Sequence, residues 1–275
     1  MMLPTDLRDG VLRIATDAAQ AILAVYAQEF AVQRKDDHSP VTQADLAAHR
    51  VIVAGLQALT PDIPVLSEES GSLLDGPARH AWTRLWLVDP LDGTREFIKR
   101  NGEFTVNIAL IDHGMAVWGV IQQPVSGRLW HGGTGQGAFA RDGIDGDDAP
   151  IHVRVPATAP LRVAASRSHR DGHTQAVLQA MGAIREDSCG SSLKFCRIAE
   201  GHIDVYPRFG PTSEWDTAAG QAILEGAGGQ LVDPRGRPFR YNQRDTLLNG
   251  DFIALGDAAL PWRAWLAQAG AMAAG

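Results

Sequence analysis

The stretch Trp86-Leu87-Val88-Asp89-Pro90-Leu91-Asp92-Gly93-Thr94 joins a short apolar run to two aspartates three residues apart. The apolar run predicts a buried strand. Since proline cannot extend a central strand, we expect the strand to end at Pro90 and both aspartates to leave it on a tight loop. Two converging carboxylates beside free backbone amides would suit a hard cation that holds a phosphate. An Asp-rich turn without a function fits these nine residues almost as well.

Length and composition predict a globular protein with a sizeable core. The chain has 275 residues, of which 45% are hydrophobic and 21% charged, which leaves room for two domains. The net charge of -7 and the lack of a Lys/Arg cluster argue against nucleic acid as a partner. Two cysteines without a zinc-ligand pattern predict reduced thiols and a cytoplasmic protein. We expect no signal peptide and no membrane-spanning segment.

Two helices are predicted near the N-terminus. Apolar residues recur at spacings of three and four from Leu7 to Val25, which predicts an amphipathic helix. A second helix is expected to run to about Leu59, and Thr42 with Asp45 at its start has the form of a capping box. From spacing alone, Asp45 is more readily a helix cap than a functional carboxylate. The polar segment 33–40 between the two helices predicts a loop or an exposed hairpin.

Acidic side chains also follow the short apolar pair Val65-Leu66. If this pair and the run before Asp89 are neighbouring strands, Glu68 lies near Asp89 and Asp92; the alternative is an exposed acidic turn. Residues 71–81 are expected to form a surface loop. An antiparallel meander is predicted beyond residue 104, because apolar segments alternate there with turn signals. Its expected strands are Phe104–Ile111, Val117–Gln122, Leu129–Gly132 and Ala138–Ala140.

Beyond residues 156–160, strands and helices are predicted to alternate, so we expect a domain of residues 1–155 and a smaller α/β domain of residues 156–275. The last strand region is expected over 247–249 and 252–255. Asp216 lies in the first turn of a predicted helix and, alone, reads as a surface residue that offsets the helix dipole. Gly190 to Lys194 open another helix and favour an anion site about as much as an ordinary helix entry.

Three pieces taken together resemble the lithium-sensitive, magnesium-dependent phosphatase superfamily that includes the inositol monophosphatases. They are Asp89-Pro90-Leu91-Asp92-Gly93-Thr94, Trp215-Asp216-Thr217-Ala218-Ala219-Gly220 and the pair Glu68-Glu69. The resemblance covers nearly the whole chain. It implies an α+β fold, a layered α/β/α/β/α sandwich in which two long helices cover a largely antiparallel N-terminal sheet and a smaller α/β domain follows.

Within that superfamily the chain looks most like the bacterial 3′(2′),5′-bisphosphate nucleotidases. The segments that carry this likeness are 99–107, 190–196 and 206–212. Where inositol monophosphatases usually carry an acid that holds sugar hydroxyls, this chain has Arg208-Phe209-Gly210. The resemblance therefore implies hydrolysis of adenosine 3′,5′-bisphosphate (PAP) to AMP and phosphate, and also of its sulfated precursor PAPS, in support of sulfur assimilation.

The resemblance also implies roles for individual residues. Two or three Mg²⁺ ions would be held by Glu68, Asp89, the Leu91 carbonyl, Asp92 and Asp216, with Glu69 in an outer or third-metal position. Asp45 and Thr94 would orient and deprotonate the attacking water, so that Asp45, Thr94 and Glu68 form the catalytic set. The residues implied to contact substrate are Glu68, Leu91, Asp92, Gly93, Thr94, Ser166, His169, Gly190, Lys194, Arg208 and Asp216.

Two other functions remain open on the sequence. One is an inositol or sugar phosphatase of the same superfamily, against which the Arg208 region argues. The other is a non-catalytic nucleotide-binding homologue, against which the complete acidic set argues. The resemblance implies a cytoplasmic protein that is soluble or loosely attached to the inner face of the cell membrane. The sequence does not fix the oligomeric state, and a homodimer is one compatible assembly.

Overall fold

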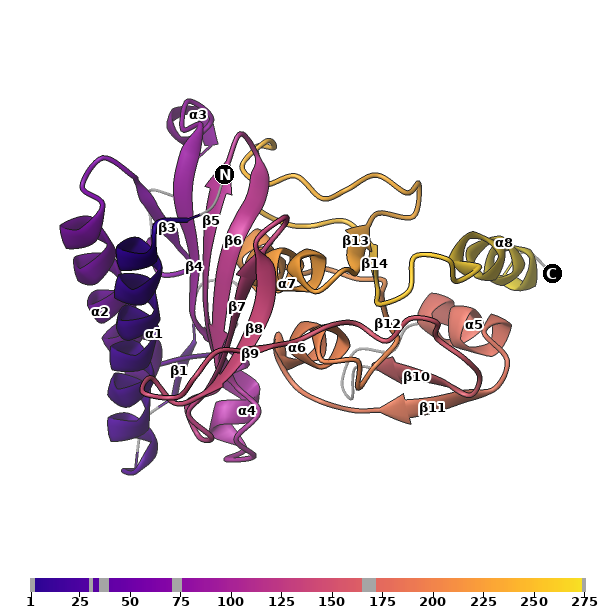
Figure 1. Cartoon of the computed structure of the whole chain (residues 1–275), viewed down its shortest axis with the longest axis horizontal. Coiled ribbons are helices and arrows are strands. Elements are labelled where there is room, and N and C mark those ends of the chain that lie inside the picture. The colour runs from indigo at the N-terminus through magenta and orange to yellow at the C-terminus, as the bar shows by residue number, and fades with distance from the viewer. Residues whose placement is uncertain (1–2, 30–31, 35–39, 71–75, 165–171, 274–275) are drawn as a thin grey trace.

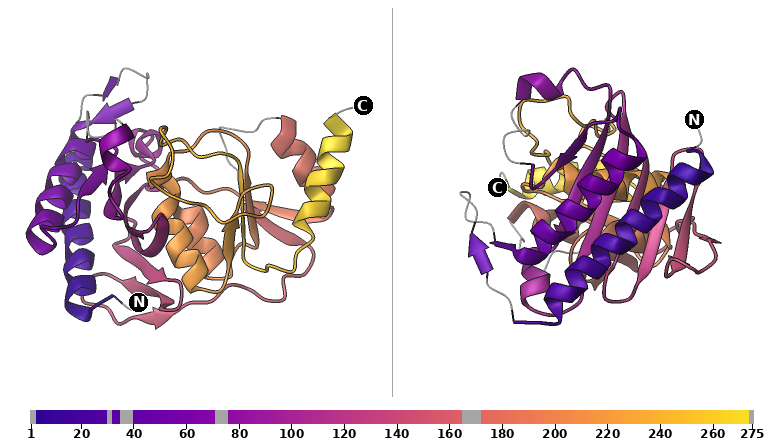
Figure 2. Two further views of the ribbon diagram at one scale, coloured as in Figure 1. Left: turned by 90° about the horizontal axis from the view of Figure 1, so that it is seen from above. Right: turned by 90° about the vertical axis from the view of Figure 1, so that its left-hand side faces the viewer.

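The computed structural model describes residues 3–29, 32–34, 40–70, 76–164 and 172–273, and they stack in five layers (Figure 1). Helices α1 and α2 cover one face of a seven-stranded sheet, and α6 and α7 lie between that sheet and a five-stranded one. Helices α5 and α8 pack together on the far side of the second sheet (Figure 2). The predicted α/β/α/β/α sandwich is therefore confirmed.

The first sheet is the predicted meander with one parallel strand added at its edge. Its strands follow the order β3-β4-β5-β6-β7-β8-β9, and only the β3–β4 pair is parallel. These strands are β3 (Val65–Ser67), β4 (Arg84–Asp92), β5 (Thr105–Asp112), β6 (Met115–Gln122), β7 (Arg128–Gly133), β8 (Gly137–Asp142) and β9 (Ala149–Pro150).

The outer face of this sheet is covered by α1 (Thr5–Tyr26) and α2 (Gln43–Leu59), as the apolar periodicity predicts. One face of α1 is buried, from Val11 to Ile22, and packs with α2 in a shared core. Strands β1 (Val32–Arg34) and β2 (Pro40–Thr42) pair antiparallel, which agrees with the expected hairpin, although residues 35–39 lie outside the described chain.

The prediction that the strand ends at Pro90 is wrong. Strand β4 continues to Asp92, and its register with β5 shifts between Asp89, which pairs with Asn107, and Asp92, which pairs with Thr105. Two residues of β4 therefore face one residue of β5, which is a β-bulge. Proline is tolerated at a bulge because no ladder hydrogen bond is needed there, so Pro90 bends the strand without ending it.

The predicted surface loop over 71–81 is also wrong in its second half. Residues Gly76–Arg79 form the short helix α3, and the side chain of Arg79 is fully buried at 0% exposure. Residues 71–75 lie outside the described chain. A buried guanidinium needs several hydrogen-bond acceptors, and its acceptors come from residues 242–245 of the distant β13–β14 loop.

The second sheet has the order β11-β10-β12-β14-β13, with β10 parallel to both β11 and β12, and with β14 antiparallel to both of its neighbours. Of the last predicted strand region only 252–255 forms a strand, and Leu248 makes an isolated bridge with Ser213.

The strands of the second sheet are β10 (Leu161–Ala164), β11 (Ile184–Asp187), β12 (Val205–Arg208), β13 (Gln230–Val232) and β14 (Phe252–Leu255). The helices are α4 (Thr94–Ile98) in the first half, then α5 (Gly172–Ala180), α6 (Leu193–Ala199), α7 (Glu214–Gly226) and α8 (Trp262–Ala273).

Helix α7 lies almost against the backbone of the first sheet. A Cβ atom added at Gly119 of β6 would lie 2.7 Å from the Ala219 Cα and 2.8 Å from its carbonyl oxygen. The absence of a side chain at Gly119 therefore sets how closely α7 approaches the sheet. Asp216, in the first turn of α7, depends on this approach.

We expect Gly119→Ala to lower the free energy of unfolding by about 1–3 kcal/mol, because the new methyl group meets rigid backbone instead of a flexible side chain. Urea unfolding monitored by circular dichroism measures the change. Gly270→Ala is the matched control, since a Cβ there meets nothing within 4 Å and alanine favours the helix. Equal stability of the two variants would contradict the proposed close approach.

Candidate active site

The bulge in β4 turns two aspartates toward the same side of the sheet. Without it, residues three apart on a strand would point to opposite faces. Their partners Asn107 and Thr105 lie two apart on β5, so Asp89 and Asp92 share one face. The Asp89 carboxylate also accepts a hydrogen bond from the Leu91 amide at 3.0 Å, which fixes it within the bulge.

A third aspartate comes from α7, between the two sheets. Asp216 closes a capping box at the start of that helix, where its Oδ2 accepts the Ser213 amide at 2.8 Å. One carboxylate oxygen from each of Asp89, Asp92 and Asp216 lies within 4.8 Å of the others. The residue that, alone, read as a surface aspartate offsetting the helix dipole thus faces the two aspartates of β4.

The carboxylates of this cluster strongly disfavour one another's charge. Burial, and then the neighbouring Glu68 and Asp92, raise the pKa of Asp89 well above its ordinary value. Burial and Asp92 raise the pKa of Asp216 to about 8. A buried set of crowded carboxylate oxygens suits a hard divalent cation such as Mg²⁺. The acidic cluster could therefore hold metal.

Glu68 lies beside this cluster, as the neighbouring-strand argument predicts. Glu68 directly follows β3, and its amide donates to the Val88 carbonyl of β4 at 3.1 Å. Its carboxylate acts on both Asp89 and Asp216, raising their pKa values. Its oxygens lie outside the group of three whose ligand atoms all fall within 4.8 Å.

Asp45 and Thr94 also meet at this site. The Thr94 hydroxyl, at the start of α4, lies 3.2 Å from Asp45 Oδ1, while Asp45 Oδ2 accepts the Thr42 amide at 2.8 Å and hydroxyl at 2.7 Å. Asp45 is therefore a helix cap and a partner of Thr94 at once. Burial raises its pKa, against the Thr42 hydrogen bonds that lower it. A raised pKa brings a carboxylate closer to the range that a general base needs.

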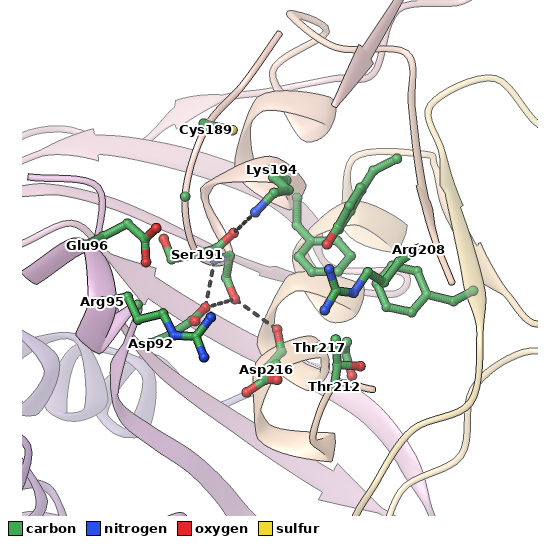
Figure 3. Close-up of a pocket in the computed structure, with 16 residues that line it drawn as sticks. Asp92, Arg95, Glu96, Cys189, Ser191, Lys194, Arg208, Thr212, Asp216 and Thr217 are labelled. Carbon is green, nitrogen blue, oxygen red and sulfur yellow. Dashed lines mark hydrogen bonds between the residues drawn. The ribbon is translucent and has the colours of Figure 1, made fainter. Parts of the chain in front are cut away.

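A pocket opens beside the acidic cluster and is lined by cationic side chains. Figure 3 shows Arg95 and Arg208 reaching toward Asp92 and Asp216 from opposite walls. Lys194 is buried, with its Nζ donating to the Ser191 carbonyl at 3.0 Å and lying 5.3 Å from the Tyr206 ring centroid. Cations next to carboxylates give the pocket a charge pattern that fits a phosphate compound bound with metal.

The remaining predicted substrate residues are placed as follows. Gly190 lines the pocket, but its amide donates to Glu103 Oε2 at 2.8 Å. Leu91 is buried, and its carbonyl lies 3.5 Å from the Thr94 hydroxyl. Ser166 and His169 fall in the range 165–171, outside the described residues.

A family model described as "Inositol monophosphatase family" matches residues 5–264. The chain belongs to the inositol monophosphatase family. It is 49% identical over 249 residues to the 3′(2′),5′-bisphosphate nucleotidase CysQ of Escherichia coli O157:H7, which covers 89% of this chain and 97% of the relative. It is 40% identical to the protein of the same name from Buchnera aphidicola, over 90% of this chain and 92% of the relative.

Solved structures of the inositol monophosphatase family have the same fold. CysQ from Bacteroides thetaiotaomicron superposes with a TM-score of 0.78 at 40% identity, over 90% of this chain and 96% of that one. An inositol monophosphatase from Thermotoga maritima superposes with a TM-score of 0.79 at 22% identity, which supports the fold alone. Among the described helices, none is long and apolar enough to span a bilayer.

Two residues that the sequence did not mark as site residues fix one aspartate of this inositol monophosphatase family member. Asp92 Oδ2 accepts the Ser192 amide at 2.7 Å and lies 2.6 Å from the Ser192 hydroxyl. Asn107 Nδ2 lies 3.2 Å from the same oxygen and 2.9 Å from Ser192 Oγ. The sequence did carry a signal for Asn107: Thr105 and Asn107 are polar residues two apart within an otherwise apolar buried strand.

In the metal-free protein, we expect stability to fall as pH rises from about 4 to about 8. Asp216 has a higher pKa when folded than its ordinary value of 3.8, so the folded state binds more protons over this range and loses stability as they leave. Asp216→Asn keeps an oxygen for the Ser213 amide but cannot ionise. Thermal unfolding in EDTA should therefore show a smaller pH-dependent loss for this variant; equal losses would contradict the assignment.

Proposed function

We propose that this chain is a 3′(2′),5′-bisphosphate nucleotidase, a phosphoric monoester hydrolase that converts PAP to AMP and phosphate and also accepts PAPS. The observation that carries the proposal is the cluster of Asp89, Asp92 and Asp216 beside a pocket with three cationic side chains. The 49% identity to an enzyme of that name over 89% of the chain supports the choice of substrate class.

The metal site that we propose takes two or three Mg²⁺ ions. Its ligands are the carboxylates of Glu68, Asp89, Asp92 and Asp216 and the carbonyl of Leu91. When bound, Mg²⁺ supplies the positive charge that draws a phosphate to this acidic site and makes a water more acidic. Ser192 and Asn107 bind Oδ2 of Asp92, which leaves its Oδ1 as the oxygen that would hold metal. Such partners hold a ligand in one geometry.

The proton that leaves the attacking water is taken up by the Asp45–Thr94 pair in this mechanism. Thr94 Oγ1 orients the water while its own proton points to Asp45 Oδ1, and Asp45 gains the proton. Water oxygen then bonds to phosphorus opposite the 3′ oxygen, and the bond between phosphorus and that oxygen breaks. A second water protonates the leaving oxygen, and the hydroxide that remains takes the proton back from Asp45. The amides of Gly93 and Thr94, at the start of α4, would donate to the phosphoryl oxygens.

Substrate choice is set by the cationic side chains that line the pocket. PAP carries a second phosphate, and Arg95, Lys194 and Arg208 supply positive charge where an inositol ring would need acceptors for its hydroxyls. Guanidinium groups are well suited to phosphate because they donate two parallel hydrogen bonds. These contacts are the basis on which we prefer the nucleotide to a sugar phosphate.

Phosphate release from PAP, PAPS, 3′-AMP and inositol 1-phosphate tests the proposed function directly. With Mg²⁺, we expect kcat/KM for PAP to exceed that for inositol 1-phosphate by at least about tenfold, since hydrogen bonds to a charged group contribute about 1.5–3 kcal/mol. A preference for inositol 1-phosphate would show a sugar phosphatase instead. Binding of PAP by calorimetry without turnover would show a non-catalytic homologue.

Thr94→Val should lower kcat for PAP by about 100-fold or more, because it removes the hydroxyl that connects water to Asp45 while keeping the shape of the side chain. Thr94→Ser is the matched control, since it keeps the hydroxyl and should retain most of the activity. Steady-state phosphate release with saturating Mg²⁺ compares the two. Similar activity of the valine and serine variants would refute the role of Thr94.

A further inference from the structure

The turn that presents Asp216 is held in place by the loop between β13 and β14. The Asn249 amide donates to the Thr212 carbonyl at 2.7 Å, and the Glu214 amide donates to the Leu247 carbonyl at 2.8 Å. The Asn249 side-chain amide donates to the Ser213 carbonyl at 2.7 Å. These bonds bracket the capping box of α7, so the loop contributes to the position of the Asp216 carboxylate.

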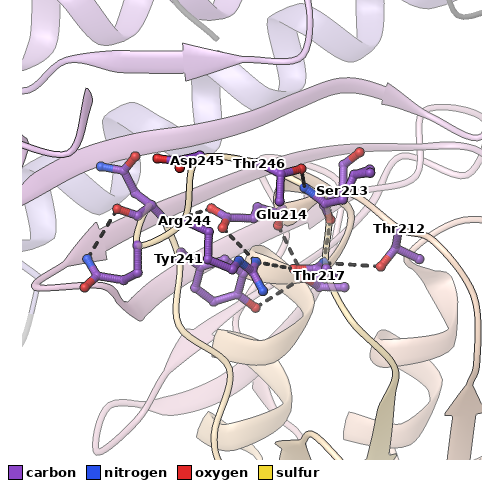
Figure 4. Close-up of polar contacts among 12 residues, drawn as sticks. Thr212, Ser213, Glu214, Thr217, Tyr241, Arg244, Asp245 and Thr246 are labelled. Carbon is purple, nitrogen blue, oxygen red and sulfur yellow. Dashed lines mark hydrogen bonds and ion pairs between the residues drawn. The ribbon is translucent and has the colours of Figure 1, made fainter. Parts of the chain in front are cut away.

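A buried carboxylate connects this turn to the same loop (Figure 4). The Glu214 side chain is 0% exposed and accepts the Asn242 amide at 2.7 Å and Arg244 Nη2 at 2.8 Å. Arg244 Nη2 also lies 3.2 Å from Asn249 Oδ1. Glu214 therefore has both carboxylate oxygens occupied by donors from the loop, which compensates for its burial.

Arg79 extends this network to the first sheet. Its Nη1 donates to Asn242 Oδ1 at 2.8 Å, and its Nη2 donates to the carbonyls of Arg244 at 2.7 Å and Asp245 at 2.6 Å. Asn242 returns a bond from Nδ2 to the Arg79 carbonyl at 2.6 Å. Arg79 ends α3, which precedes strand β4. The segment leading into β4 is thus tied to the loop that holds α7.

These ties act against an electrostatic force at the acidic cluster. One carboxylate oxygen of Asp216 lies within 4.8 Å of oxygens of Asp89 and Asp92, so like charges repel the start of α7 from the first sheet. Buried hydrogen-bonded networks resist displacement because every broken bond leaves an unsatisfied polar group. The four residues Arg79, Asn242, Arg244 and Glu214, here the Arg79–Glu214 network, therefore oppose this repulsion.

We propose that the Arg79–Glu214 network is a positioning device that holds Asp216 at the distance from Asp89 and Asp92 at which a divalent cation binds. This inference rests on the metal site proposed above. It assigns functions to residues that touch neither metal nor nucleotide. Its distinctive consequence is that damage to the network weakens cation binding, while saturating Mg²⁺ restores the chemistry.

Two variants test this inference in the full-length protein. Glu214→Gln keeps size and one acceptor but turns an amide NH₂ toward Arg244, and Arg79→Lys keeps the charge but cannot reach all of its acceptors. For each, the thermal unfolding temperature of the metal-free protein is measured as Mg²⁺ is added, without substrate. We expect the half-saturating Mg²⁺ concentration to rise about tenfold, in the range found for partners that orient metal ligands. In the assay with PAP, kcat should recover at saturating Mg²⁺ while KM for PAP changes little.

Arg154→Lys is the matched control, because Arg154 makes a two-point ion pair with buried Asp204 at 2.8 and 2.5 Å, away from the acidic cluster. It should lower the unfolding temperature without changing the half-saturating Mg²⁺ concentration. If the wild type responds to Mg²⁺ and both network variants titrate like Arg154→Lys, the positioning role is wrong. If the wild type shows no Mg²⁺-dependent stabilisation, the proposed metal site fails as well.

Discussion

Mutual repulsion among buried carboxylates is the constraint around which the site is built. Oxygens of Asp89, Asp92 and Asp216 lie within 4.8 Å of one another, and Glu68 adds further negative potential. Such a cluster is unfavourable for folding on its own, so it persists only where the surrounding structure fixes each acid separately. The bulge fixes Asp89, Ser192 and Asn107 fix Asp92, and a capping box backed by a buried network fixes Asp216.

The layered fold gives these acids their different origins. Two come from a strand in the first sheet and one from a helix lying between the sheets, so their distances depend on how closely α7 packs on β6 at Gly119. Most of the chemistry and most of the recognition come from different halves of the chain. The acids and the Asp45–Thr94 pair belong to the first sheet and its helices, apart from Asp216. Of the cations, Lys194 and Arg208 come from the second half of the chain and Arg95 from α4 in the first.

The sequence predicted local structure well because helix and meander periodicities are properties of short segments, as in α1, α2 and β5 to β8. The capping box of Thr42 and Asp45 could be predicted for the same reason. The continuation of β4 past Pro90 could not be predicted from the sequence, because the neighbouring strands on both sides determine it. The burial of Arg79 could not be predicted either, because its acceptors lie more than 160 residues away in the chain. The meeting of Asp216 with Asp89 and Asp92 was predicted only through resemblance to a family, because its position alone indicated a surface residue that offsets the helix dipole.

Asp45 and Asp216 each give one oxygen to the backbone at the start of a helix and turn the other part of the carboxylate toward the site. Loss of either acid therefore weakens a helix as well as the chemistry, because the backbone amide of the N-cap residue loses its acceptor. A relative that has lost catalysis would still gain helix stability from both aspartates. Their presence in a relative is consequently poor evidence of activity, whereas Thr94, whose hydroxyl caps neither of these helices, is the more informative position to inspect.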